Sequence, residues 1–334
     1  MIEVKNLVKR YGDHVAVNNL SFTVEEGQIY GFLGPNGAGK STTMNIITGY
    51  LASTEGEVLI NGHNILEEPE EAKKCIGYLP ELPPVYTDMT VLEYLKFVAE
   101  LKKIPKDQRK KQILEVMNLV KITDMQNRLI KNLSKGYRQR VGLAQAVLGF
   151  PEIIILDEPS VGLDPKQIIE IRELIRQLAK KHTVILSSHI LAEVREVCDY
   201  ILIISKGKLV ASDTPENLER NLGDSDLIEI ETKADPDEVR RILETVDGIR
   251  SISTKHLENG IAWAQIQEKK NTDVREKVFQ AFAQNHQPLL KLNPLQVSLE
   301  DVFMELTQSD RAAEEYAEKA KKKETEDMKD AGDL

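Results

Sequence analysis

A glycine-rich segment near the N-terminus has the residue types needed to bind phosphate groups. Residues 34–41 fit the pattern G-x-x-x-x-G-K-[ST]. Glycines let such a loop curl so that successive N–H groups point at phosphate oxygens, and a following helix adds its positive end. Lys40 would supply a full charge to the β- and γ-phosphates, and Ser41 a hydroxyl ligand for Mg²⁺. The residues expected at this nucleotide site are Gly34, Pro35, Asn36, Gly37, Ala38, Gly39, Lys40, Ser41 and Thr42.

Two adjacent carboxylates, Asp157 and Glu158, follow the apolar run 153–156. A buried strand would place them at its C-terminal end, where α/β sheets bind ligands. Asp157 would hold Mg²⁺ directly or through water, and Glu158 would polarise a water molecule aimed at the γ-phosphate. Alone, such a pair is more often a solvated strand end or a helix cap. The phosphate loop favours the catalytic interpretation.

The elements that must position these residues follow from apolar patterns and turn signals. In the first part of the chain we expect strands over 2–5, 14–24, 28–33 and 58–60, and a helix over 42–48. The strand over 28–33 leads directly into the glycine-rich loop, and a helix follows the loop. The phosphate-binding motif requires this context.

From residue 90 to about 150 the apolar spacing becomes helical, and Thr90 and Glu93 form a capping-box signature. Strands and helices then alternate along the chain. The expected order is strand 151–156, helix 168–178, strand 183–187, helix 191–197 and strand 200–205. This alternation predicts a parallel sheet covered by helices on both faces.

A polar break at 217–226 separates a second region. Its expected order is strand 227–232, helix 236–246, strand 250–255, strand 261–267, helix 272–285 and strand 289–292. This is a ferredoxin-like α+β order. We therefore expect domains at 1–220 and 227–307, with a short helix over 298–306. The charged tail at 311–334 would be a solvated helix or disordered.

The composition restricts the possible functions. The 334 residues include 44 Lys plus Arg and 54 Asp plus Glu, a formal charge of −10. This acidic balance argues against general binding to nucleic acid or anionic lipid. Two distant cysteines, Cys75 and Cys198, suit a reducing interior. The longest apolar runs are far shorter than the about 20 residues of a spanning helix, and no signal core is present. We expect a cytosolic chain whose membrane role depends on a partner.

Further segments add a family resemblance. Residues 133–139 look like the signature segment of the nucleotide-binding subunits of ABC transporters, and 160–164 resemble their D-loop. His189 follows its strand as the switch histidine of that family does, and Tyr11 stands where an aromatic residue stacks on adenine. The resemblance covers about residues 1–220. It implies a P-loop ABC ATPase domain with an antiparallel β subdomain and a helical subdomain at about 85–150.

The resemblance also implies a mechanism and partners. Two nucleotide-binding subunits, identical or different, would pair head to tail, and each ATP would contact the phosphate loop of one and the signature of the other. Ser134 and Gly136 suit this role, because a hydroxyl and a backbone N–H at a helix start form an anion site. ATP binding and hydrolysis would close and release the dimer, and this cycle would drive separate transmembrane permease subunits. The expected location is the cytoplasmic face of the plasma membrane.

Two positions depart from the family pattern. The signature segment has Lys135 where glycine is usual and Tyr137 where glutamine is usual. These two residues make the start of the helix more basic and bulkier. Glu81 replaces the glutamine of the Q-loop. A carboxylate can still be an oxygen ligand for Mg²⁺, together with Ser41 and Asp157, but it adds negative charge near the attacking water.

The segments 78–81, 133–139 and 298–303 look like the bacterial export-type subclass, which includes drug, antibiotic-peptide and gliding-motility systems. This resemblance favours an ATPase subunit of an exporter, docked to its permease through residues 81–90 and the helical stretch after them. One alternative is a soluble ABC-type ATPase acting on ribosomes or nucleic acid, although the single phosphate loop and the acidic charge disfavour it. The other is a regulatory module that binds ATP without cleaving it.

Overall fold

The computed structural model describes residues 1–222, 227–257, 260–269, 272–295 and 298–308. They divide into two compact units. The first contains Met1–Pro215 and the residues from Phe303 onward, and the second contains Glu216–Val302. No helix among the described residues has both the length and the apolar character needed to cross a bilayer.

The first unit begins with an antiparallel sheet in the order β2-β1-β4-β5. Its strands are β1 (Ile2–Tyr11), β2 (His14–Val24), β4 (Glu55–Ile60) and β5 (His63–Asn64). Asn61 and Gly62 join β4 to β5 with φ angles of 50° and 86°. Positive φ at both central residues is the geometry of a tight hairpin turn, and it explains the Asn-Gly pair.

A six-stranded sheet forms the centre of the same unit, in the order β10-β9-β3-β8-β7-β6. Its strands are β3 (Ile29–Leu33), β6 (Ile76–Leu79), β7 (Ile153–Asp157), β8 (Thr183–Ser187), β9 (Tyr200–Ser205) and β10 (Lys208–Asp213). All neighbours pair in parallel except β10, which is antiparallel to β9. β7 and β8 are buried along their whole length, which explains why both are almost uniformly apolar.

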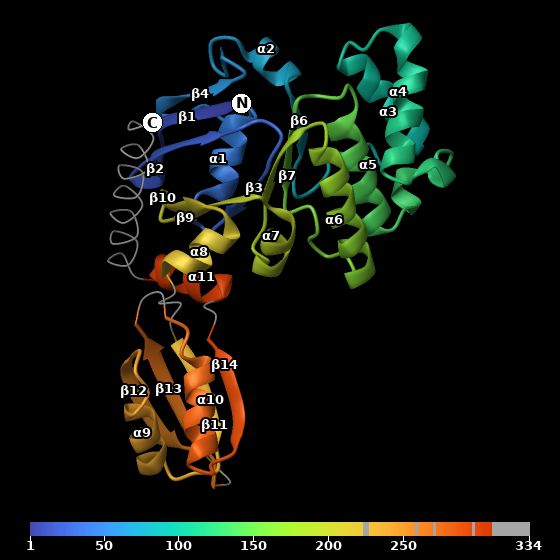
Figure 1. The fold of residues 1–334 in the computed structure, drawn as a ribbon. Coiled ribbons are helices and arrows are strands. Elements are labelled where there is room, and N and C mark those ends of the chain that lie inside the picture. Colours follow the sequence, from blue (N-terminus) through green and yellow to red (C-terminus); the bar gives the residue numbers. More distant parts are fainter. Residues whose placement is uncertain (223–226, 258–259, 270–271, 296–297, 309–334) are drawn as a thin grey trace, which may run out of the picture. The chain divides into compact units, whose positions relative to one another are not determined.

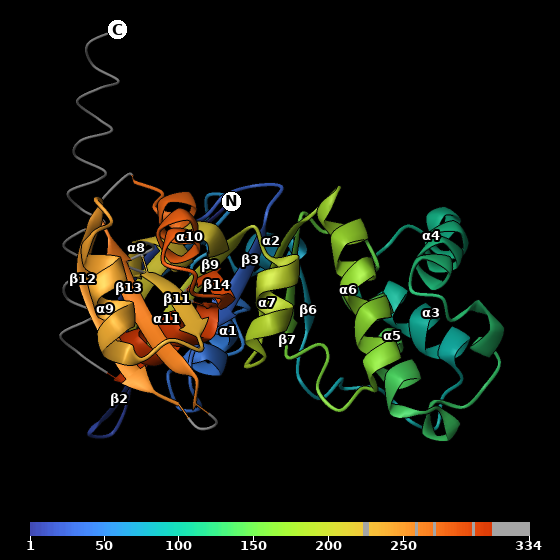
Figure 2. The same ribbon diagram turned by 60° about the horizontal axis from the view of Figure 1, so that its bottom comes forward.

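Among the helices of this unit are α1 (Lys40–Ile47), α2 (Pro69–Lys74), α3 (Val91–Leu101), α4 (Lys106–Leu119), α5 (Lys135–Val147), α6 (Pro165–Ala179) and α7 (Leu191–Val197). They pack on the six-stranded sheet or, in the case of α3 and α4, on α5 (Figure 1). The predicted capping box is present at the start of α3, where Thr90 and Glu93 each bond the other's backbone N–H. Figures 1 and 2 both show α3, α4 and α5 together at one side of the unit.

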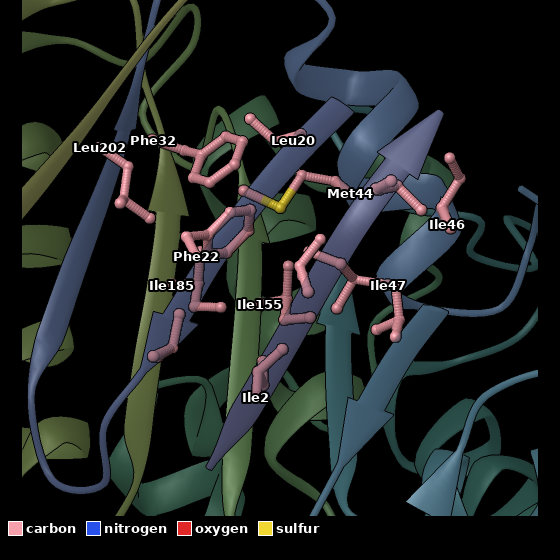
Figure 3. Packing of buried hydrophobic residues seen from close by; sticks show 14 of the residues in the cluster. Ile2, Leu20, Phe22, Phe32, Met44, Ile46, Ile47, Ile155, Ile185 and Leu202 are labelled. Atoms are coloured by element: carbon pink, nitrogen blue, oxygen red, sulfur yellow. The ribbon is translucent and has the colours of Figure 1, made fainter. Parts of the chain in front are cut away.

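The main hydrophobic core of the first unit lies between the two sheets, with α1 packed against it (Figure 3). Met44 and Ile47 of α1 are fully buried there. The rings of Phe22 and Phe32 come from different sheets, and their centroids lie 5.4 Å apart. Burying one such side chain contributes roughly 1.5–3 kcal/mol, so this contact helps hold the phosphate-loop strand β3 in place.

Strand β6 and helix α5 approach each other at backbone distance. A Cβ atom at Gly77 would lie 2.2 Å from the carbonyl oxygen of Ala146, and one at Gly142 would lie 2.7 Å from Pro83. Neither position can hold a larger residue without moving backbone or a rigid proline ring. Glycines on both surfaces therefore set the spacing of β6 and α5.

The second unit has the ferredoxin-like order of elements. They are β11 (Leu227–Thr232), α9 (Pro236–Glu244), β12 (Ile249–His256), β13 (Ala262–Glu268), α10 (Arg275–Gln284) and β14 (Leu289–Pro294). The sheet order is β12-β13-β11-β14, and every pairing is antiparallel. Residues of α9 and α10 such as Val239, Leu243 and Phe282 form a core with Ile230 and Ile266 of the sheet.

Several elements were not expected from the sequence. The polar stretch at 217–226 was interpreted as a break, but α8 (Pro215–Leu222) occupies most of it. β6, β10 and α2 had no counterpart among the predicted elements, while α11 (Leu299–Gln308) overlaps the helix predicted at 298–306. The prediction for the tail at 311–334 lies outside the described residues.

Candidate functional site

The candidate site lies where several parallel strands end. β3 leads into the glycine-rich loop, β7 ends at Asp157 before Glu158, and β8 ends two residues before His189. Because β3, β8 and β7 are parallel neighbours, these three ends share one edge of the sheet. A cleft of about 490 Å³ lies there, lined by Tyr11, His14, Ala16, Pro35, Asn36, Gly37, Ala38, Gly39, Lys40, Ser41, Thr42, Glu81, Glu158, Val161 and His189.

The loop requires its glycines for two different reasons. Gly39 has φ 103°, and a Cβ atom there would lie 2.5 Å from the Ala16 carbonyl oxygen. Gly34 packs against backbone, since its Cβ would lie 2.4 Å from the Ile204 oxygen. At Gly37, with φ 80°, a Cβ would meet no atom within 4 Å. The loop is thus fixed to the sheet at both ends and open toward the cleft between them, as a phosphate cradle must be.

Lys40 begins α1, and its ammonium lies inside the loop. Its Nζ donates to the carbonyl oxygens of Gly34 at 2.6 Å and Pro35 at 3.3 Å. Burial lowers the pKa of Lys40, while the charges of Glu158 and Asp157 act in the opposite direction. A buried cation with two neutral acceptors is suited to bind an anion such as a phosphate group.

The carboxylates after β7 are held by the end of β8. The Ser187 hydroxyl donates to Asp157, and the backbone N–H of Glu158 donates to the Ser187 carbonyl oxygen at 3.1 Å. His189 Nδ1 lies 2.8 Å from Glu158 Oε2. The two side chains predicted to be catalytic therefore form a hydrogen-bonded pair at the cleft.

The carboxyl of Glu158 has the properties of a general base. Burial raises its pKa, while the hydrogen bond and charge of His189 and the charge of Lys40 partly oppose this rise. A raised pKa makes a carboxylate a stronger proton acceptor as long as it remains ionised. Glu158 also has φ 49°, in the left-handed region that few non-glycine residues adopt and that recurs at functional sites.

Tyr11 and Glu81 border the same cleft. Tyr11 ends β1 with its ring 49% exposed, and Lys9 Nζ lies 5.4 Å from the ring centroid. A ring held at the rim with one face accessible can stack on a nucleobase. Glu81 is an exposed residue two positions beyond β6, so its carboxylate is free to turn into the cleft.

Gly34 and Asp157 do not line the cleft but lie directly behind it. Gly34 contributes its carbonyl to Lys40, and Asp157 is only 7% exposed and accepts the Ser187 hydroxyl. Three lining residues, His14, Ala16 and Val161, were not predicted. The sequence around Ala16 does not indicate its place at the cleft, because its closeness to Gly39 depends on how β2 packs against the loop.

Of the described residues around this cleft, none belongs to the signature segment. Ser134 is exposed and caps α5 by accepting the N–H of Tyr137 at 3.4 Å. Gly136 is buried, and a Cβ there would lie 2.7 Å from the Gln167 side chain. At the start of α5, Ser134 is therefore exposed away from the phosphate loop of its own chain, while Gly136 packs against α6.

Comparisons with known proteins agree with this geometry. The family model described as ABC transporter matches residues 17–161. The chain is 35% identical to YhcH, an uncharacterized ABC transporter ATP-binding protein of Bacillus subtilis, over 92% of this chain and 96% of that protein. It is 31% identical to the linearmycin resistance ATP-binding protein LnrL of Bacillus subtilis, over 92% of this chain and 98% of that protein. A solved dimeric ATP-binding cassette in a post-hydrolysis state, bound to ADP and phosphate, matches with a TM-score of 0.59 at 27% identity, over 64% of this chain and 98% of that chain.

Proposed function

The chain belongs to the ATP-binding proteins of ABC transporters, and on this premise we propose that it hydrolyses ATP in the cleft at Gly34–Ser41 to power an exporter. Its relative LnrL is named for resistance to linearmycin, which supports export rather than import.

The observation that supports this mechanism best is the Glu158–His189 pair at the phosphate loop. Lys40 would bind the outer phosphates, and Glu158 would accept a proton from the attacking water. His189 would hold the Glu158 carboxylate in place through its 2.8 Å contact. Ser41 and Asp157, with Glu81, are the oxygen ligands suited to Mg²⁺. When bound, Mg²⁺ neutralises developing charge on the phosphates.

A second copy or a related subunit would complete the site. The exposed Ser134 hydroxyl and the start of α5 would form an anion site, and neither lines the cleft at the phosphate loop of the same chain. Pairing two chains head to tail would bring this site to the partner's nucleotide. ATP would then stabilise the dimer by binding both subunits, and hydrolysis would release it.

The test uses two substitutions in the purified chain. Lys40→Ala removes the phosphate-binding charge and is expected to lose ATP binding and hydrolysis. Glu158→Gln keeps the shape but removes the base, and it is expected to bind ATP, lose at least about 100-fold in kcat and accumulate as an ATP-dependent dimer. ATPase rates, nucleotide titration and size-exclusion chromatography measure these three properties.

Glu152→Gln is the matched control, because exposed Glu152 immediately precedes β7 and lies at the opposite end of the strand from Glu158. It should hydrolyse ATP like the wild type. Near-normal turnover in both Lys40→Ala and Glu158→Gln would refute the assignment. A specific activity that does not depend on protein concentration would refute the shared site.

The membrane partner is proposed to dock beside the segment after β6. A hollow of about 480 Å³ lies there, lined by Asn45, Tyr50, Ile76, Tyr78, Pro80, Pro84, Lys102, Gln145 and Ala146. Tyr50, which lines the hollow, is 83% exposed, and in the segment after β6 Leu82 is 79% and Tyr86 56% exposed. Exposed apolar surface of this kind marks protein interaction sites.

We expect Tyr86→Ala combined with Met89→Ala to abolish transport while sparing the ATPase activity of the isolated chain. Transport is measured as the drug resistance of cells that express the full transporter, and hydrolysis is measured as phosphate release. Phe279→Ala on α10 is the control, because Phe279 is a similarly exposed aromatic residue that belongs to the second unit. Transport that persists in the double variant would show that this docking site is wrong.

A further inference from the structure

Glu193 on α7 is a buried carboxylate without a role in the proposed mechanism. It is only 5% exposed. Burying a carboxylate costs several kcal/mol unless hydrogen bonds or an opposite charge compensate for it. A residue needed only for packing could be apolar. The contacts of the Glu193 carboxylate therefore indicate its role in the structure.

The contacts join the two loops that bear the Glu158–His189 pair. Glu193 Oε2 accepts the hydroxyl of Ser160 and, at 3.4 Å, the hydroxyl of Ser188. Ser160 stands two residues after Glu158, and Ser188 directly precedes His189. One carboxylate oxygen therefore bonds both loops at once.

The remaining contacts hold Glu193 itself in place. Its Oε1 lies 3.9 Å from Arg172 Nη2 on α6 and makes no hydrogen bond among the described residues. Arg172 is in turn paired with Glu196, which is 49% exposed at the molecular surface. The cation of α6 thus offsets the charge of Glu193, while only Oε2 is engaged by the loops.

We propose that Glu193 is a positioning residue that fixes Ser160 and Ser188 and thereby sets the hydrogen bond between Glu158 and His189. The inference rests on the proposed function, since it assigns a role within the same hydrolytic site. Hydrogen bonds to an ionised acceptor are about twice as strong as neutral ones, which suits a junction between two loops. Glu193 does not line the cleft, so it acts only through its two serines.

This role predicts a particular kinetic signature. The glycine-rich loop makes none of the Glu193 contacts, so ATP binding should be retained when they are removed. Glu193→Ala is expected to lower kcat at least about tenfold and to leave the KM for ATP within about twofold of wild type. A general loss of structure would instead lower the folded fraction and weaken nucleotide binding as well.

Two further variants separate positioning from packing. Glu193→Gln keeps an acceptor oxygen for the serines and should recover kcat to within about threefold of wild type. Glu196→Ala is the matched control on the same helix, because it removes a carboxylate that pairs with Arg172 but touches neither loop. It should behave like the wild type.

If Glu193→Ala does not fold, Ser160→Ala and Ser188→Ala each remove one hydroxyl donor and test the same junction. Both should lower kcat, and the double variant should lose less than the product of the single losses, since both act through one carboxylate.

The inference would be overturned if kcat were unchanged in Glu193→Ala, or if kcat and ATP affinity fell equally. The proposed function would still hold in that case, provided that the wild type hydrolyses ATP. For the serine variants, an unchanged kcat or fully multiplicative losses would likewise overturn the inference. Absence of ATPase activity in the wild type would instead refute the proposed function itself.

Discussion

At the scale of single residues, the protonation of Glu158 links structure to rate. Burial raises the pKa of this carboxyl, and the hydrogen bond from His189 lowers it. Burial is the larger effect, so the pKa of Glu158 is raised overall. Above this pKa the carboxylate is ionised and can accept a proton, and below it the base is lost.

We therefore predict a shifted pH profile for His189→Ala. Removing the imidazole leaves burial less opposed, so the pKa of Glu158 rises further and the acidic limb of kcat begins at a higher pH than in the wild type. The maximal rate also falls, because the carboxylate is no longer held. Steady-state kcat measured from about pH 5 to 8 reports both changes.

His63→Ala provides the control. His63 lies on β5, outside the cleft, and its Nδ1 is 3.3 Å from Glu68 Oε2, a contact comparable to that between His189 and Glu158. Its profile should overlay that of the wild type. An acidic limb in His189→Ala at or below the wild-type position would contradict the assigned pairing.

Residue-scale prediction from the sequence rests on the local spacing of residues. The loop residues from Pro35 to Thr42, with Tyr11, Glu81, Glu158 and His189, do border one cleft. Ala16 and Glu193 could not be found in this way. Their roles depend on contacts between segments far apart in the chain, and the residues next to them in the sequence do not indicate those contacts.

At the scale of elements, helix α5 is tied to its neighbours by one arginine. Arg140 is only 7% exposed, donates to the Val120 carbonyl oxygen at 3.0 Å and pairs with Glu170 of α6. Val120 caps the end of α4. Arg140 thus joins the signature helix α5 to the end of α4 and to α6.

We predict that Arg140→Ala destabilises the first unit by about 2 kcal/mol, because it leaves a buried carbonyl and a carboxylate without their donor. Arg138→Ala, an exposed arginine on the same helix, should change stability by less than about 0.5 kcal/mol. Urea unfolding of both variants measures the difference. Equal stabilities would show that Arg140 does not tie the helices together.

Element prediction was best where a strand is buried on both faces. The strands at 183–187 and 200–205 and the helix at 191–197 occur at the predicted residues. β6 was missed because Ile76–Leu79 is only four residues long and contains a glycine, so it becomes a strand through pairing with β7. β10 is an antiparallel edge strand, and its pattern of partial burial gives little apolar signal.

At the scale of the whole molecule, each unit has its own hydrophobic core. Phe32 is fully buried in the first core and Phe282 in the second. The sequence indicated two domains through the change from alternating α/β order to the ferredoxin-like order. Their boundary is harder to predict, because α8 is polar enough to resemble a linker.

We predict two separable unfolding transitions. Phe32→Ala and Phe282→Ala should each lower the stability of one unit by about 3–5 kcal/mol and leave the transition of the other unit in place. Scanning calorimetry of the intact chain reports both transitions. A single transition displaced equally by both substitutions would show that the two cores unfold together.

The glycine contacts between β6 and α5 have a consequence for communication through the molecule. β6 leads to Glu81 at the cleft, and α5 begins beside Ser134. Gly77 brings the β6 backbone against the Ala146 carbonyl oxygen near the C-terminal end of α5, whereas Gly142 lies against the ring of Pro83 and the side chain of Leu79. We therefore expect a displacement of β6 to press directly on the backbone of α5 at Ala146, near the helix end opposite Ser134.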